Sequence, residues 1–525
     1  SCNVLHFGDN QAFSVWYVRR RSMQIVLLAL YCTVLIVLCT YGAHRATLVF
    51  QCLRYKRRLE RASRSVAVAE ADLPTVTVQL PLYNEATVVR RLLDAAGAID
   101  YPSDRLELQV LDDSTDETQG IARAAVEELR ERGVNAVYLR RPDRHGYKAG
   151  ALDFGLKQAS GELIAIFDAD FVPQASFLKD IVGHFMDPRI GMVQTRWEHI
   201  NRDHSLLTSI QALMLDGHHM VENRARFGAG NMFNFSGTGG MWRRQAIQDA
   251  GGWEHDTLTE DLDLSYRAQL AGWRFVYRGD VLTPAELPED MSSFRAQQYR
   301  WAKGTVQTAR KLLKRVAKSD LTFSQRVEAC FHMLPHFAYP MTVLLTLLLL
   351  PALVFMPASD VRTLLLIDLP LCIGATGSLA TFYTMAEVAQ GRSAWGALKR
   401  LPALIALGAG LSPHLSAAVF DGLRSMAGEF VRTPKRGEQR GRYRQAAKLP
   451  LVEIALAAVC AGSVVASVQT GHYFATPFAV LFMCGYTYVA ALVIQEQFGF
   501  GRASEEVAPV SERGAEDVSG MARAA

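Results

Sequence analysis

Long apolar runs divide the chain into segments that suit a membrane and one segment that suits water. Residues 25–50 are apolar over a length that can cross a bilayer. Comparable apolar runs lie at residues 333–355, 363–388, 449–469 and 473–494. Between residues 65 and 326, polar and charged residues interrupt every apolar stretch. We therefore expect a water-soluble body placed between membrane-spanning helices.

The same pattern, with the basic residues added, predicts a division into segments and an orientation. The predicted segments are an N-terminal segment with the first transmembrane helix (1–64), a soluble domain (65–290), amphipathic interfacial helices (291–330), a transmembrane pair (331–390), an interfacial or re-entrant helix with a loop (391–448), a second transmembrane pair (449–495) and a disordered tail (496–525). Basic residues such as Lys56, Arg57 and Arg58 are more numerous after the first apolar run than before it. Because positively charged flanks stay in the cytoplasm, we expect the soluble domain on the cytoplasmic side.

Residues 402–423 are apolar enough to span, but basic residues flank them on both sides. The sequences Gly408-Ala409-Gly410 and Ser412-Pro413 interrupt the helical pattern. Since both flanks favour the cytoplasm, we interpret this stretch as an interfacial or re-entrant helix.

Within the soluble body, short apolar strands alternate with helical patterns. The predicted strands are 75–81, 106–111, 134–139 and 163–167, and the predicted helices are 88–93, 121–132 and 149–159. Such alternation is typical of an α/β fold with a mostly parallel sheet, which binds ligands beyond the carboxyl ends of its strands. Tyr83, Glu85, Asp113, Asp168 and Asp170 follow these strands, so we expect them to line one crevice.

Asp168 and Asp170 are hard oxygen ligands directly after a buried strand. This chemistry suits Mg²⁺ or Mn²⁺ carrying a diphosphate, although a turn or a helix cap would also use aspartate. Lys148, at a predicted helix start, is a candidate for binding phosphate, with a solvated lysine as the alternative. The first strand is not followed by a Gly-x-Gly-x-x-Gly motif, which disfavours a dinucleotide fold. The net charge of +4 disfavours nucleic acid as a partner, and the eight cysteines lack the spacing of a disulfide framework or a zinc site.

An ordered set of short motifs is more specific than any one of these residues. The motifs are Leu-Pro-Leu-Tyr-Asn-Glu (80–85), Leu-Asp-Asp-Ser (111–114), Phe-Asp-Ala-Asp (167–170), Thr-Glu-Asp (259–261) and Gln-Gln-Tyr-Arg-Trp (297–301). Together they resemble the inverting family 2 glycosyltransferases, and among them the processive membrane synthases of β-linked polysaccharides. Residues 193–199 and 235–243 are most similar to plant cellulose-synthase-like enzymes that make mannan, glucomannan or the xyloglucan backbone, and to their bacterial relatives. The resemblance implies a GT-A-type nucleotide-sugar domain inserted between transmembrane helices.

The resemblance and the residue chemistry together define the candidate site. Asp261 would be the general base, with Glu260 and Thr259 beside it, and Asp168 and Asp170 would bind the metal. The predicted nucleotide-sugar residues are Tyr83, Glu85, Asp113, Lys148, Asp168, Gln297, Arg300, Trp301 and Lys303. The predicted acceptor residues are Gly237, Thr238 and Trp301, and a loop similar to the gating loop of bacterial cellulose synthase contains Phe430, Arg432, Thr433 and Lys435. Arg432 departs from that family, which has an apolar residue there.

The implied reaction is displacement of a nucleoside diphosphate from a sugar C1 by an acceptor hydroxyl, with inversion. A carboxylate must accept the hydroxyl proton, and a divalent cation with Arg300 and Lys303 would stabilise the leaving group. We expect a hexosyltransferase that polymerises a β-1,4-glucan, mannan or glucomannan from a UDP-glucose or GDP-mannose type donor and exports it. Its partners would be the growing glycan and membrane lipid, and its location a bacterial inner membrane or a Golgi-type membrane.

Two alternatives remain open at this point: transfer of a single sugar to a lipid, as in ceramide glucosyltransferases, and a glycan conduit subunit. Candidate groups to line a conduit are Tyr339, Tyr383, His414, Tyr486 and Tyr488, although each residue type is also common in ordinary helix packing.

Overall fold

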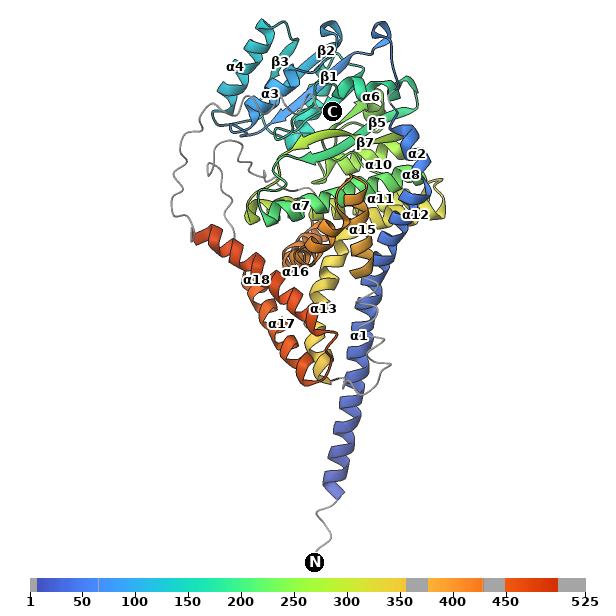
Figure 1. Cartoon of the computed structure of the whole chain (residues 1–525), viewed down its shortest axis with the longest axis vertical. Helices are drawn as coiled ribbons and strands as arrows, with labels where there is room; N and C mark the ends of the chain where they lie inside the picture. Colours follow the sequence, from blue (N-terminus) through green and yellow to red (C-terminus); the bar gives the residue numbers. More distant parts are fainter. Residues whose placement is uncertain (1–6, 65, 356–375, 427, 429–448, 499–525) are drawn as a thin grey trace, which may run out of the picture.

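The computed structural model describes residues 7–64, 66–355, 376–426, 428 and 449–498. An α/β domain occupies one end of the molecule, and long helices extend from it (Figure 1). The N-terminal helix α1 (Phe7–Arg54) reaches furthest from the sheet.

The sheet of the α/β domain has seven strands among the described residues, in the order β3-β2-β1-β4-β6-β5-β7. The strands are β1 (Val76–Leu82), β2 (Leu106–Asp112), β3 (Ala136–Leu139), β4 (Leu163–Ile166), β5 (Ile190–His199), β6 (Gly240–Arg243) and β7 (Arg274–Ala285). β6 is antiparallel to both of its neighbours, and the other pairs are parallel. The predicted mostly parallel sheet is therefore confirmed, with the four predicted strands within two residues of their observed bounds.

Helices cover the sheet, and every residue of β2 and β4 is buried. The buried polar side chains of β2 are paired with β1: Thr77 donates to Glu107 at 2.6 Å. The helices of this domain are α3 (Val89–Gly97), α4 (Thr118–Glu131), α5 (Tyr147–Gln158), α6 (Phe177–Val182), α7 (Leu206–Gly217), α8 (Arg224–Ala229), α9 (Arg244–Asp249) and α10 (Glu260–Leu270). Shorter helical turns are η1 (Glu70–Asp72), η2 (Ser103–Arg105), η3 (Gly183–Met186) and the π-helical η4 (His218–Asn223). Leu80, Val110, Ile164 and Phe167 are fully or almost fully buried at the centre of the core.

The remaining helices lie below the sheet in Figure 1, except for α2, which lies beside it. They are α2 (Lys56–Ala62), α11 (Met291–Lys318), α12 (Phe323–Met333), η5 (Pro335–Phe337), α13 (Ala338–Phe355), α15 (Ser378–Val388), α16 (Ala394–Arg424), α17 (Leu451–Gln469) and α18 (Thr476–Phe498). Among the described residues, five helical segments are long and apolar enough to cross a membrane: Arg21–Arg54, Pro335–Phe355, Ala394–Arg424, Leu451–Gln469 and Thr476–Phe498. Four of the predicted spans coincide with four of these segments. The predicted span 363–388 falls partly outside the described residues, and α15 forms its described end.

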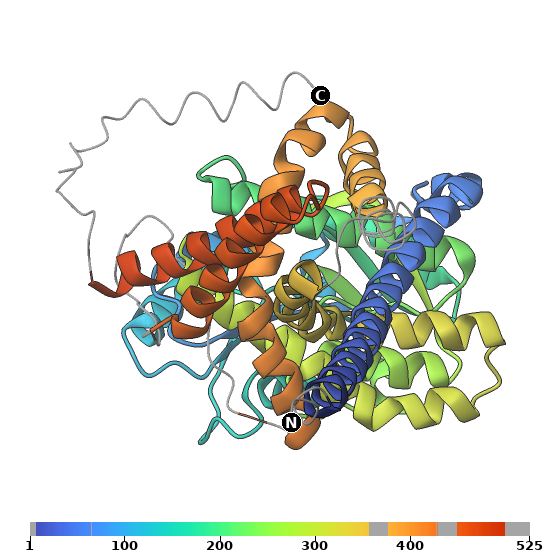
Figure 2. The ribbon, with the colours of Figure 1, turned by 90° about the horizontal axis from the view of Figure 1, so that it is seen from below.

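The predicted break in the apolar stretch 402–423 is wrong, because α16 is one continuous helix that contains Pro402 and Pro413. Gly410 serves close packing, whereas a Cβ added at Gly408 would meet no atom within 4 Å. A Cβ added at Gly410 would lie 2.3 Å from the carbonyl oxygen of Gly485 in α18, and one at Gly485 would lie 1.9 Å from the carbonyl oxygen of Ala406. Figure 1 views α16 almost along its axis, whereas Figure 2 shows it extended across the view, so α16 lies across α1 and α13. Ala394–Arg424 is also long and apolar enough to cross a membrane, so its interfacial or re-entrant placement stays a prediction.

Candidate active site

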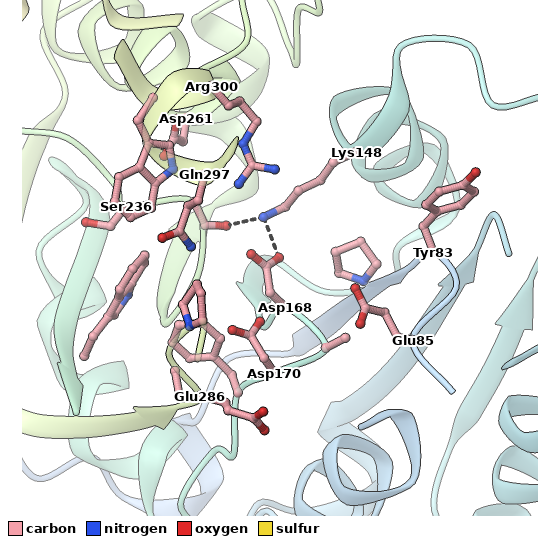
Figure 3. Close-up of a pocket in the computed structure, with 18 of the residues that line it drawn as sticks. Tyr83, Glu85, Lys148, Asp168, Asp170, Ser236, Asp261, Glu286, Gln297 and Arg300 are labelled. Atoms are coloured by element: carbon pink, nitrogen blue, oxygen red, sulfur yellow. Dashed lines mark hydrogen bonds and ion pairs between the residues drawn. The ribbon is translucent and has the colours of Figure 1, made fainter. Parts of the chain in front are cut away.

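Predicted site residues from distant parts of the chain meet in one cavity of about 180 Å³ at the carboxyl edge of the sheet (Figure 3). Loops after β1 and β4 contribute Tyr83 and Asp168, the first turn of α10 contributes Asp261, and α11 contributes Arg300. The predicted residues that line this donor cavity, as we name it, are Tyr83, Glu85, Asp113, Lys148, Asp168, Asp170, Gly237, Thr259, Glu260, Asp261, Gln297, Arg300 and Trp301. Their convergence follows from the strand topology, which brings strand ends together at one edge.

Asp168 and Asp170 lie in a turn just beyond β4, because the strand ends at Ile166. The backbone N–H of Phe171 donates to the carbonyl of Asp168 at 3.0 Å, which closes this turn. Both carboxylates point into the donor cavity (Figure 3). The two aspartates are therefore not part of an extended strand, and the turn itself brings both side chains to the same wall of the cavity.

Lys148 stands opposite these acids. Gly146 at φ +70° precedes α5, and Lys148 follows in its first turn. The Lys148 Nζ lies 2.5 Å from Asp168 Oδ1 and donates to the carbonyl of Gly237 at 3.0 Å. Burial lowers the pKa of Lys148, but Asp168 and Glu260 raise it more, so the net shift is upward. Lys148 is therefore a buried ammonium group, and the solvated alternative is wrong.

Asp261 and Glu260 begin α10, directly after Thr259. The Thr259 hydroxyl lies 3.0 Å from the Thr308 hydroxyl of α11, and Asp261 Oδ1 accepts from the backbone N–H of Leu262 at 2.8 Å. Burial, and to a lesser extent the charge of the neighbouring Glu260, raise the pKa of Asp261 to about 7. Burial also raises the pKa of Glu260 itself. A carboxyl that titrates near neutrality has the proton affinity that a general base needs.

Gln297, Arg300 and Trp301 lie one turn apart on α11, so they share the helix face that borders the donor cavity. Lys303 lies about a third of a turn away from this face, and it is not among the residues that line the cavity. A Cβ added at Gly428 would lie 3.5 Å from the Lys303 ammonium, so Lys303 points toward that residue. The predicted placement of Lys303 at the diphosphate is therefore not found. The loop residues Phe430, Arg432, Thr433 and Lys435 lie outside the described residues.

Thr238 lies behind the cavity wall and is 1% exposed. Its hydroxyl accepts from the backbone N–H of Asp168 at 2.9 Å and so supports the turn that carries the aspartates. The structure thus corrects the prediction of Thr238 as an acceptor contact, whereas its neighbour Gly237 does line the cavity.

Two arginines for which no role was predicted contact Asp113 and Tyr83, two of the predicted nucleotide-sugar residues. Arg141 donates to both oxygens of Asp113, at 2.8 and 2.5 Å. The guanidinium carbon of Arg144 lies 3.3 Å from the centroid of the Tyr83 ring, on a face where a base would stack. The basic run 140–144 before α5 is the signal that could have indicated them.

Trp197, His199 and Glu286 also line the donor cavity, although no site role was predicted for them. Trp197 and His199 are at the end of β5, and Glu286 directly follows β7. Arg91 Nη2 lies 3.0 Å from Glu286 Oε2. The rule that polar residues follow parallel strands, which identified Asp168, applies to these strand ends as well.

A second cavity, of about 310 Å³, begins on the other side of Asp261. It shares Trp197, Asp261, Gln297 and Trp301 with the donor cavity. From there it extends to side chains of α1, α12, η5 and the start of α13, which include Tyr41, His44, Arg45, Phe331, His336 and Tyr339. We name it the helix-side cavity.

Of the candidate conduit residues, Tyr339 lines the helix-side cavity. The hydroxyl of Tyr486 instead lies 2.9 Å from that of Thr346, and His414 Nε2 donates to the carbonyl of Arg295 at 3.1 Å. Tyr383 packs edge to face on Phe382, and Tyr488 packs on an apolar cluster of helices. For these residues the packing interpretation fits the described structure.

Comparisons with known proteins agree with the sequence motifs. Residues 74–304 match the family described as Glycosyltransferase like family 2. Glucomannan 4-beta-mannosyltransferase 1 of Oryza sativa subsp. japonica is 36% identical over 342 residues, which cover 62% of this chain and 66% of that protein. Glucomannan 4-beta-mannosyltransferase 2 of Arabidopsis thaliana is 41% identical over 257 residues, 48% of each chain. The chain thus spans about half to two thirds of the length of these curated relatives.

Among solved structures, the mannosyltransferase PcManGT from Pyrobaculum calidifontis in complex with GDP-Man and Mn²⁺ has a TM-score of 0.49 and 23% identity, and the match covers 74% of this chain and 99% of that one. The strand order, the acids at the carboxyl edge and the sequence family point to the same conclusion. Residues 74–304 form a glycosyltransferase family 2 domain with a GT-A-like, mostly parallel sheet.

Proposed function

We propose that the protein is an inverting, processive glycosyltransferase that elongates a β-linked glycan of the mannan or glucomannan type from a nucleotide sugar. One observation carries the proposal: Asp261, whose pKa is raised to about 7, lies on the wall between a charged cavity and a larger aromatic cavity. A base in this position can take a proton from an acceptor on one side while the donor occupies the other. The names of the plant relatives, glucomannan 4-beta-mannosyltransferases, support the mannan-type product.

The donor cavity fits a nucleotide sugar and a divalent cation. Asp168 and Asp170 present hard carboxylate oxygens on one wall. Burial raises the pKa of Asp168, Lys148 lowers it, and the charge of Asp170 raises it, so the net shift is upward. We assign these two residues as the ligands of Mg²⁺ or Mn²⁺, which when bound would neutralise part of the diphosphate charge. Lys148 and Arg300 supply further positive charge, and the paired donors of Arg300 suit phosphate oxygens. Tyr83, Glu85 and Asp113 lie toward the nucleoside end.

The chemistry at C1 then needs one proton acceptor and one direction of attack. The ionised Asp261 takes the proton from the acceptor hydroxyl as that oxygen bonds to C1, and the bond to the diphosphate oxygen breaks on the opposite face. The anomeric carbon inverts, so an α-linked donor gives a β-linkage. Trp197 and Trp301, which border both cavities, offer flat apolar faces to sugar rings.

The helix-side cavity would provide the path along which the product leaves. It extends from Asp261 to Tyr41 and His44 of α1 and to Tyr339 of α13, and both helices are long and apolar enough to cross a membrane. We infer an integral membrane protein whose catalytic domain lies in the cytoplasm, with the glycan leaving between these helices. A polar polymer requires such a path, because its hydroxyls are costly to place in hydrocarbon.

The test is a panel of nucleotide sugars, including GDP-mannose and UDP-glucose, given to the purified full chain with Mg²⁺ or Mn²⁺. We expect release of the nucleoside diphosphate and a high-mass product that β-mannanase or a related β-glycanase degrades. A product with one sugar added to a lipid would replace this proposal with single-sugar transfer, and no turnover of any donor would contradict both.

A further inference from the structure

Helix α11 has two sets of contacts that face different parts of the molecule. Gln297, Arg300 and Trp301 border the donor cavity. Other residues of the same helix, at positions 291, 292, 295 and 299, make polar contacts with α16, α17 and α18. These three helices follow the catalytic domain in sequence, and each is long and apolar enough to cross a membrane.

The contact with α17 is an ion pair between buried side chains. Arg295 Nη2 lies 2.9 Å from Glu453 Oε1, and the two side chains are 13% and 5% exposed. Arg295 Nη2 also donates to His414 Nδ1 of α16 at 3.3 Å. A buried acid in an otherwise apolar helix is costly unless it is paired, so Glu453 has a strong requirement for Arg295.

The contact with α18 is a helix cap supplied from far along the chain. Glu496 accepts from the backbone N–H groups of Met291 and Ser292, at 2.6 and 2.9 Å, and from the Ser292 hydroxyl at 2.6 Å. The first turn of a helix leaves such N–H groups without partners inside the helix, and its positive end attracts a carboxylate. Asp290, the N-cap residue, accepts from the backbone N–H of Ser293 at 2.7 Å, and Glu496 satisfies the two N–H groups before it, so α18 is bonded to the first turn of α11.

The contacts with α16 begin among the cavity-facing residues and continue beyond them along α11. The Tyr299 hydroxyl donates to the carboxylate of Asp421. Further along α11, Arg310 Nη1 donates to the carbonyl of Gly422 at 2.8 Å, and Gln307 Nε2 donates to the carbonyl of Ser425 at 3.0 Å. The carboxyl end of α16 is thus bonded to α11 over several turns.

We propose that Glu453, Glu496 and Asp421 are positioning residues that hold α11 so that Arg300 and its neighbours meet the donor. The inference rests on the proposed function and extends it, because it makes the helices after the catalytic domain part of the donor site. The contacts at 291, 295 and 299 lie within about two and a half turns of Arg300, and a helix moves as a stiff unit over that length. A shift of about 1 Å at the reacting groups costs about 100-fold in rate.

A charge swap tests the pair Arg295–Glu453. The variants are Arg295→Glu, Glu453→Arg and the double variant, assayed as the full chain in detergent or in membranes. For each single variant we expect the donor KM to rise about fivefold or more and kcat to fall about tenfold or more, because a displaced Arg300 binds the diphosphate less well. We expect the double variant to restore both constants to within about threefold of wild type.

A matched control separates positioning from loss of folded protein. Arg243 is 12% exposed, lies in β6 and bonds to Glu162 and to the carbonyl of Ile190, away from α11. We expect Arg243→Glu to lower the amount of folded enzyme and leave the donor KM unchanged. Glu496→Gln and Tyr299→Phe keep the size of their side chains, and we expect a raised donor KM from each of them even if the charge reversals do not fold.

An unchanged donor KM in all the α11-contact variants, with only the yield reduced as in Arg243→Glu, would overturn the inference. Failure of the proposed function looks different, because the wild-type chain itself would then release no nucleoside diphosphate from any nucleotide sugar.

Discussion

The donor cavity and the helix-side cavity share the wall that carries Asp261, yet their linings differ. The donor cavity, about 180 Å³, contains Lys148, Asp168, Asp170 and Arg300. The helix-side cavity, about 310 Å³, is lined largely by aromatic side chains, imidazoles and amides, and also by Arg45 and the ion pair of Glu222 with Arg226. In the proposed reaction, the first cavity would take the charged diphosphate and the second would take the acceptor glycan. The difference would then separate stabilisation of the leaving group from binding of the acceptor, with Asp261 as the proposed base on the shared wall.

Removing the proposed base should have the largest effect on turnover, because the wall shared by the two cavities then lacks its proton acceptor. We expect Asp261→Asn to lower kcat by about 10²–10⁴-fold while the donor still binds, since a neutral amide cannot accept the hydroxyl proton. Turnover and donor binding are measured separately, by release of nucleoside diphosphate and by titration calorimetry. Full turnover in this variant would remove Asp261 from the mechanism.

Loss of the metal site should affect the donor cavity alone. We expect Asp170→Asn, or removal of divalent metal with a chelator, to lower kcat about 100-fold, because the leaving diphosphate loses a neutralising charge. The measurement is turnover as a function of Mg²⁺ and Mn²⁺ concentration.

A cluster of acids away from the cavity provides the control for this experiment. Glu254, Asp256 and Asp263 lie close enough together to bind a metal, but Lys311 contacts all three. We expect Asp256→Asn to leave the metal dependence unchanged. The same metal response in Asp170→Asn and wild type would contradict the assignment.

The pH dependence of turnover should report Asp261. Its pKa is raised to about 7, and the base acts only when ionised, so kcat should fall about tenfold for each pH unit below about 7. The charge of Glu260 contributes to this raised pKa, so Glu260→Gln should move the acidic limb to lower pH. An acidic limb that stays in place in Glu260→Gln would show that another group titrates.

Changes in the helix-side cavity should have the smallest effect on each transfer step. We expect Tyr339→Ala to shorten the product and to lower kcat by less than about tenfold, because a lost sugar contact costs about 1 kcal/mol. The donor KM should not change, since Tyr339 does not line the donor cavity. Product length by gel filtration together with donor KM makes the distinction, and Tyr488→Ala, which alters helix packing instead, is the control.

The catalytic domain was largely predictable because its chemistry follows local rules. Asp168, Asp261 and Arg300 were identified from short motifs, and the strands fell close to their predicted bounds. Arg141 and Arg144 were missed because the loop between β3 and α5 decides which of its basic side chains reach Asp113 and Tyr83. That loop has no repeating pattern of apolar residues from which the directions of its basic side chains could be predicted.

The helical region was less predictable, since hydropathy locates helices but not their partners. Gly408 and Gly410 indicated a break because glycine weakens isolated helices. In the fold, Gly410 lies against Gly485 of α18, and the absence of a side chain there favours a continuous, closely packed helix. The same residue type thus has opposite consequences according to a neighbour that is distant in sequence.

The sequence by itself determined the first four strands, most of the apolar helices and the acids that follow the strands, because these depend on patterns within a few residues. The tertiary structure alone decided that two cavities share Asp261, that Thr238 lies behind the wall and that Glu496 caps α11. Glu496 and Ser292 are 204 positions apart in the chain. Contacts of this kind arise from the packing of whole elements, which no local pattern of residues encodes.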